Sequence, residues 1–129
     1  MTDQVTAIGP VRVELPPVSA MSRVARLTAT GVASMAGLTI DQIDDINVIV
    51  SEVMVALVEH GATETIALTF DVADGCFTVR GATEIADFDL DHPDLALCRT
   101  VLAAVSTTHG IEHEGTRAEI WATLQQSQS

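Results

Sequence analysis

A single carboxylate stands inside the most apolar segment of the chain. Between Val48 and Val58 only Ser51 and Glu52 are polar, and this pattern predicts a helix that is covered on most of its sides. A carboxylate in that setting takes up a proton or finds a cation, backbone N–H groups or a ligand. Glu52 is therefore a candidate for catalysis or ligand binding, and the alternative is a carboxylate in a partly solvated groove.

The residue one helical turn after Glu52 lacks the group that would complete such a site. Ala56 follows at i+4 on the same helix face, where a metal or nucleotide site would place an amide or a second carboxylate. Magnesium requires oxygen ligands, and an alanine methyl offers none. The sequence therefore contains only half of a candidate site.

The histidines and cysteines do not form a recognisable ligand set in the sequence. Three histidines are too scattered for a zinc site, and the fourth follows the predicted helix end, where it favourably meets the helix dipole. The two cysteines have no CxxC spacing, so we expect reduced structural thiols rather than a metal or redox role. The scattered histidines are His92, His109 and His113, the histidine at the helix end is His60, and the cysteines are Cys76 and Cys98. We expect no metal site.

Length and charge narrow the function classes. The chain has 129 residues, of which 47% are apolar, which suits one domain with one core. We place that domain at residues 10–124, with flexible ends at 1–9 and 125–129. The net charge of -12 disfavours binding to nucleic acid or to anionic membrane surfaces. With no candidate span and no signal peptide, we expect a cytoplasmic protein whose partner has a basic face.

The periodicity of apolar residues predicts the order β, α, α, β, β, α, β. A strand at 11–15 precedes a helix at about 20–35, and Thr39 or Asp41 caps a second helix that ends at Gly61. Runs at 65–72 and 76–80 flank Asp74-Gly75, a type I′ hairpin signal. A third helix begins near Pro93, and a closing strand covers 118–124. We expect a two-layer α/β (α+β) sandwich, a mixed but mostly antiparallel sheet with about three helices on one face.

The chain resembles the GHKL (Bergerat-fold) ATPases, and among them the small bacterial anti-sigma-factor serine kinases. The resemblance rests on the opening strand before SAMSRVAR, on GLTIDQIDDINVIVSEVMVALVEHG at the place of the family's N-box helix, and on GTRAEIWATL at its closing Gly-Thr strand. It covers nearly all of residues 10–124. The resemblance implies that Glu52 occupies the general-base position, and that Ala56 replaces the asparagine that ligates magnesium.

The other nucleotide-binding motifs of that family are absent from their expected places. The glycine-flanked aspartate that reads adenine corresponds to residues 80–84, where Gly81 alone remains. The glycine-rich turn that cradles phosphate corresponds to residues 92–97, which contain no glycine. We therefore expect a vestigial Glu52, no bound cofactor and no kinase activity. The alternative is an active serine/threonine kinase that uses ATP and magnesium to phosphorylate an anti-sigma-factor antagonist.

The resemblance implies a protein partner, either a sigma factor or an anti-sigma-factor antagonist, and a role in partner switching in transcription or stress control. A homodimer, or a heterodimer with a paralogue, is a further alternative. We expect partner contacts on the first helix and on the acidic segment 84–94, whose alternative role is a solvated loop. For Arg23 and Arg26 the alternative is a solvated position on the helix. We expect Trp121 to pack in the core or on the sheet face, and the alternative is an interface anchor. The expected partner-binding residues are Arg23, Arg26, Asp87, Phe88, Asp89 and Asp91.

Overall fold

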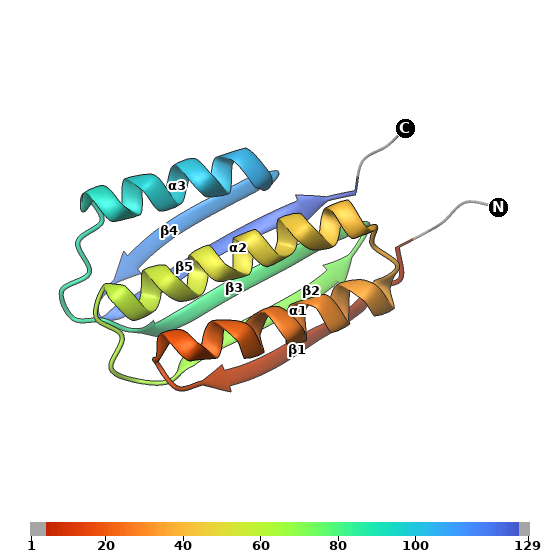
Figure 1. Ribbon diagram of the computed structural model, residues 1–129. Helices are drawn as coiled ribbons and strands as arrows, with labels where there is room; N and C mark the ends of the chain where they lie inside the picture. The colour runs from red at the N-terminus through yellow and green to blue at the C-terminus, as the bar shows by residue number, and fades with distance from the viewer. Residues whose placement is uncertain (1–4, 127–129) are drawn as a thin grey trace.

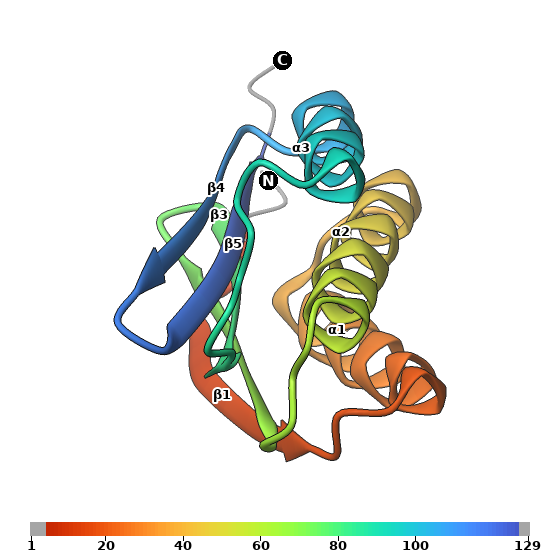
Figure 2. The same ribbon diagram turned by 90° about the vertical axis from the view of Figure 1, so that its left-hand side faces the viewer.

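Among the residues that the structure describes, three helices lie on one face of a five-stranded sheet and none covers the other face (Figure 2). The computed structural model of the chain describes residues 5–126. The elements follow in the order β1 (Ile8–Leu15), α1 (Ser22–Ala36), α2 (Ile40–Glu59), β2 (Ile66–Ala73), β3 (Cys76–Glu84), α3 (Pro93–Val105), β4 (Thr108–Glu114) and β5 (Arg117–Gln125). A short 3-10 helix, Ser19–Met21, precedes α1. The predicted two-layer α+β architecture is confirmed.

The strands are antiparallel throughout and are arranged in the order β1-β2-β3-β5-β4, so β1 and β4 form the edges (Figure 1). Asp74 and Gly75 both have positive φ, 54° and 75°, as the predicted type I′ turn between β2 and β3 requires. Strand β4 was missed because its sequence, THGIEHE, is polar and none of its side chains is fully buried. Such an edge strand gives no clear alternation of apolar and polar residues.

The ends of α2 are set by local sequence signals. Thr39, and not the alternative Asp41, caps the helix: its Oγ1 accepts the Gln42 backbone N–H at 3.2 Å, and the Gln42 side chain accepts the Thr39 N–H at 2.8 Å. This reciprocal pair is a capping box. The helix ends at Glu59, with His60 as its C-cap residue.

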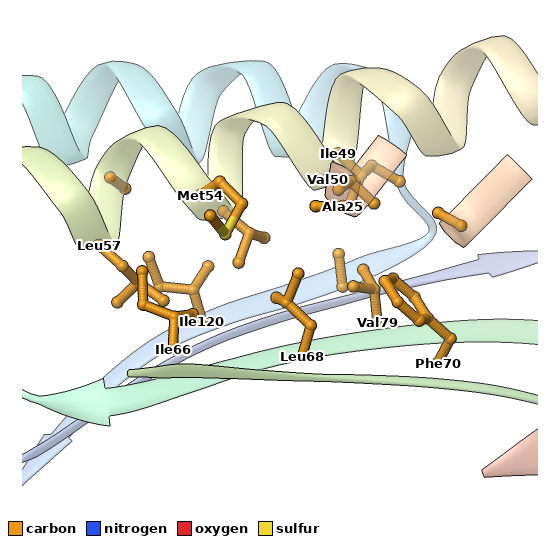
Figure 3. Packing of buried hydrophobic residues seen from close by; sticks show 14 of the residues in the cluster. Ala25, Ile49, Val50, Met54, Leu57, Ile66, Leu68, Phe70, Val79 and Ile120 are labelled. Carbon is orange, nitrogen blue, oxygen red and sulfur yellow. The ribbon is translucent and has the colours of Figure 1, made fainter. Parts of the chain in front are cut away.

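Helix α2 is the centre of the core. Ile49, Val50, Met54 and Leu57 are 0–1% exposed, and Figure 3 shows them directed toward the sheet side chains Leu68, Phe70 and Ile120. The helix α1 packs on one side of α2, and α3 on the other (Figure 1). The groove along α2 lies on its α3 side.

The two ends of the chain extend further into the sheet than the sequence indicates. Ile8 and Gly9 lie in β1, and Gln125 lies in β5, although all three were placed in the flexible ends. Residues 1–4 and 127–129 of those predicted ends lie outside the described residues. None of the helices among residues 5–126 has the length and apolar character needed to cross a membrane.

Candidate functional site

The groove between α2 and α3 contains the carboxylate that the sequence singles out. Its lining comes from the outer face of α2, the helix end and the first turns of α3. The lining residues are Glu52, Val55, Ala56, Glu59, His60, Asp94, Leu97 and Cys98. Both members of the half site predicted from the sequence therefore lie in one groove.

Glu52 is half-buried on the wall of this groove. Burial removes water from its carboxylate and raises its pKa, because the charged form loses solvation. No arginine or histidine forms an ion pair with Glu52 within residues 5–126. The carboxylate is thus held in a partly desolvated position without a compensating cation, as the groove alternative in the sequence analysis supposes.

Cys98 faces the same wall from α3. Its Sγ lies 4.0 Å from the Glu52 backbone oxygen, and the side chain is 3% exposed. Burial and, to a lesser degree, the nearby Glu52 charge raise the pKa of the Cys98 thiol to about 11. The thiol is therefore protonated at neutral pH, which agrees with the expected structural role of this cysteine.

Ala56 lies one turn further along α2 and is 6% exposed. Its methyl group lines the groove, and so the position that would need an oxygen ligand for magnesium is apolar. Val55 and Leu97, which are 38% and 63% exposed, belong to the same lining. The groove is consequently apolar in its middle and acidic along its walls.

Gly81 does not line this groove. It is buried in β3 directly under α2, where an added Cβ would lie 2.5 Å from Val53 Cγ1 and 3.2 Å from Leu57 Cδ1. The absence of a side chain is therefore explained by the close approach of helix and sheet. The residues after it, up to Glu84, remain paired with β5.

The acidic segment between β3 and α3 is folded onto the domain. Phe88 is 5% exposed, with its ring edge-on to His60 and His113 at centroid distances of 6.4 and 5.7 Å. Arg99 donates a hydrogen bond to the Leu90 carbonyl at 3.0 Å. His113 Nε2 lies 2.8 Å from the Ile85 carbonyl oxygen. The segment is thus anchored by its apolar residues and its backbone.

Of the four partner-binding residues expected in this segment, Phe88 points inward and the three aspartates point outward. Asp87, Asp89 and Asp91 are exposed, whereas the buried Phe88 ring is not accessible to a partner in this conformation. Phe88 is buried because an apolar residue in a short acidic loop can close the end of the core. An aromatic residue between aspartates at 87 and 89 was the available signal.

The two arginines of α1 differ in their surroundings. Arg23 is exposed, and Arg26 donates a hydrogen bond from its Nη1 to Ser51 Oγ on α2 at 3.2 Å. Arg26 therefore links two helices. The outer face of α1 also carries exposed apolar side chains, with Leu27 at 67% and Met35 at 76% exposure.

Three histidines that are far apart in the sequence come together near Phe88, two against its ring and the third, His92, against His60. The ring of His60, at the end of α2, lies 4.7 Å from the ring of His92, and His113 contacts Phe88 from β4. The spacing in the sequence predicts that His92, His109 and His113 are too scattered for a metal set. The acidic segment brings His92 back to the end of α2, a long-range contact that no local pattern predicts.

The uncovered face of the sheet carries Trp121. Its indole lies against Gly110 of β4, where an added Cβ would come within 2.6 Å of Trp121 Nε1, and Arg80 lies over the ring at 5.7 Å from its centroid. Trp121 is therefore packed on the sheet face, and its neighbours Ile120 and Ala122 face the core.

Comparisons with known proteins identify the fold. A structure described as the RsbU and RsbW domains of Rv1364c from Mycobacterium tuberculosis superposes with a TM-score of 0.74 at 21% identity, covering 92% of this chain and 32% of that one. The histidine kinase AdeS from Acinetobacter baumannii superposes with a TM-score of 0.54 at 9% identity, covering 94% and 70%. The chain thus spans about a third of the length of the first of these structures.

The GHKL-like fold implied by the sequence resemblance is confirmed by these superpositions. At identities of 21% and 9% the likeness concerns the fold alone. A scan of the sequence against protein-family models and a search of curated proteins both find no match.

Proposed function

We propose that this chain is a protein-binding regulator that resembles anti-sigma-factor serine kinases but acts without ATP, by partner switching in transcription or stress control. The observation that carries the proposal is the character of the groove between α2 and α3. Glu52, Glu59 and Asp94 line it, and no arginine or lysine does so among the described residues. The carboxylates of the groove would repel a bound triphosphate, and no arginine or lysine of the groove would attract it.

Two like charges about 4 Å apart repel by about 1 kcal/mol in water and by about 4 kcal/mol at the effective dielectric of a protein surface. A magnesium ion could offset this repulsion, but Ala56 supplies no oxygen for it on this wall. Nucleotide binding in this groove is therefore disfavoured both by repulsion from the carboxylates and by the lack of a magnesium ligand at Ala56.

The end of the β2–β3 hairpin supports the same conclusion. In the family, glycines near this place let the backbone approach the nucleotide. Here Gly81 is buried against Val53, and Ala82, Thr83 and Glu84 continue the ladder with β5. Gly81 therefore has a packing role, and residues 81–84 are held in the sheet.

The surface suited to a partner is the end of the molecule where α1 starts and the acidic segment runs toward α3 (Figure 1). Asp87, Asp89 and Asp91 provide exposed negative charge, and Arg23 and Leu27 are exposed on α1. A mixture of apolar and charged side chains is typical of non-obligate interfaces. By resemblance, the partner is a sigma factor or an anti-sigma-factor antagonist.

The first test is thermal unfolding of the chain with increasing ATP and magnesium. We expect no saturable stabilisation. A nucleotide present at a concentration of about a hundred times its Kd would raise the free energy of unfolding by about 2.7 kcal/mol. A shift of that size would refute the nucleotide-free proposal. Titration with magnesium alone is the control for general ion effects.

The retained Glu52 favours one second candidate, an active serine/threonine kinase in which this carboxylate is the base. In that case ATP and an antagonist protein yield a phosphorylated antagonist, and Glu52→Ala abolishes the product while the far-UV spectrum is unchanged. Absence of product with the unaltered chain excludes the candidate.

The partner itself is tested by affinity capture with sigma factors and antagonists from the host. We expect capture by the unaltered chain and a loss of at least tenfold when Asp87, Asp89 and Asp91 are all changed to asparagine. A matched control changes three other exposed carboxylates, Asp41, Asp44 and Glu114, to their amides. Capture of neither class, or equal loss in both variants, contradicts the proposal.

A further inference from the structure

We propose that His60, His92 and Asp94 bind a divalent transition metal of the zinc type at the end of the groove between α2 and α3. Nothing in the sequence pattern or in the proposed function assigns this cluster a role. The three side chains come from the end of α2, the last residue before α3 and the first turn of α3. Figure 2 shows these chain segments at the same end of the molecule.

The spacing of the three side chains is close to that of a metal site. His60 Nε2 lies 4.0 Å and His92 Nδ1 lies 3.8 Å from the same oxygen, Asp94 Oδ2. One ligand atom from each of the three residues lies within 4.8 Å of the others. Ligand atoms bonded to zinc at about 2.0–2.2 Å stand roughly 3.3–3.6 Å apart in tetrahedral geometry. The two pairs that share Oδ2 need to contract by about half an ångström.

The ligand types select the metal class. Two imidazoles and one carboxylate suit zinc and its neighbours in the first transition series, whereas magnesium and calcium prefer oxygen ligands alone. Glu52 and Glu59 line the same groove, and their charges favour a dication over a neutral ligand. The site is therefore distinct in chemistry from a magnesium–nucleotide site.

The surroundings limit the motion of the His60 ring. Its side chain is 10% exposed, and its ring packs edge-on against Phe88 and His92 at 6.4 and 4.7 Å between centroids. A ring that is already confined loses less rotational freedom on coordination. The Asp94 side chain is 65% exposed, so it has room to move the short distance that coordination requires.

Metal binding replaces one existing interaction. His92 Nδ1 accepts the Asp94 backbone N–H at 3.0 Å and so caps α3. Coordination through this nitrogen uses the same lone pair, at the expense of one helix cap. The interaction that is lost is one neutral hydrogen bond at a helix end, and coordination replaces it with a bond from the same nitrogen to a dication.

Three protein ligands leave at least one coordination position for water or for an outside group. Because His92 terminates the acidic segment, a bound metal would fasten that segment to the end of α2. Metal binding is measured on the chain alone, so its failure is distinguishable from failure of the proposed partner binding.

The test is calorimetric titration of the full chain with zinc chloride, supplemented by the absorption spectrum with cobalt(II). We expect one ion per chain. We also expect affinity to fall at least tenfold in His92→Gln and in Asp94→Asn. The matched controls are His109→Gln, a histidine on β4, and Asp91→Asn, an exposed aspartate of the same segment; both should bind as the unaltered chain does. A Cys76→Ser background removes the more accessible thiol as a competing ligand.

Equal binding by the unaltered chain and the Asp94→Asn variant would overturn the proposal. So would equal weakening by Asp94→Asn and Asp91→Asn, since that result means general attraction to an acidic surface. Because His60 packs against Phe88, its replacement could unfold the chain. The partly exposed His92 provides the decisive variant instead, and its far-UV spectrum verifies the fold. In nuclear magnetic resonance, zinc should shift the ring signals of His60 and His92 and leave those of His109 unchanged.

Discussion

Gly81→Ala tests whether this glycine serves packing or a nucleotide. The new Cβ would lie 2.5 Å from Val53 Cγ1 and 3.1 Å from Leu68 Cδ2, far inside the van der Waals contact distance. Val53 is β-branched and lies in a helix, so its χ1 has essentially one favourable setting. Relief must therefore come from a shift of α2 away from the sheet, and overpacking of this kind costs about 1–3 kcal/mol.

The assay is urea denaturation, with the free energy of unfolding taken from linear extrapolation. The matched control is Gly31→Ala. Gly31 lies in the exposed part of α1, where an added Cβ meets nothing within 4 Å. There the substitution should stabilise the chain by about 0.5–1 kcal/mol, because alanine is the better helix former. The same chemical change is thus expected to act with opposite signs at the two positions.

A double variant isolates the contact. Val53→Ala removes the methyl group that the new Cβ meets, so in its presence Gly81→Ala should cost less than it does alone, giving a coupling of about 0.5–3 kcal/mol. If the two changes are additive, or if Gly81→Ala leaves stability unchanged while altering ATP binding, the packing explanation is refuted.

Two further predictions concern the groove. Burial raises the folded-state pKa of Glu52 above the reference value of 4.5, so the folded chain binds this proton more tightly than the unfolded chain does. The stability contributed by protonated Glu52 is fully present below the unfolded-state pKa and is lost as the pH rises through the folded-state pKa. Glu52→Gln should therefore increase the free energy of unfolding, relative to the unaltered chain, more at pH 7 than at pH 4. Urea denaturation of both chains at both pH values measures this difference, and an equal effect at the two pH values would contradict the raised pKa. Because burial raises the Cys98 pKa to about 11, iodoacetamide at pH 8 should label this thiol at least tenfold more slowly in the folded chain than in urea, as followed by peptide mass spectrometry. Equal rates would show that the thiol is accessible.

Much of the fold could be predicted because its signals are local. The Asp74-Gly75 turn, the Thr39 cap and the alternation at 66–72 each depend on neighbouring residues, and each agrees with the structure. Strand β4 could not be predicted in this way. It pairs with β5 through its backbone and buries little side-chain surface, so its sequence carries no strong pattern.

The features of the candidate site that depend on one helix could be predicted from the sequence, and those that depend on long-range contacts could not. The presence of Glu52 in an apolar helix, and the lack of an oxygen ligand at Ala56, follow from a single helix and its period of 3.6 residues. The inward position of Phe88 does not follow from sequence, because it depends on how the acidic segment returns across the end of the core.

The sequence by itself determined an acidic chain, the two-layer architecture with the order of all its main elements except β4, and a carboxylate in an apolar helix without its partner ligand. Only the tertiary structure decided that Gly81 fits under Val53 and that His60 meets His92 and Asp94. The physical reason is range: periodicity and capping act over a few residues, whereas these contacts join segments brought together by burial of a shared core.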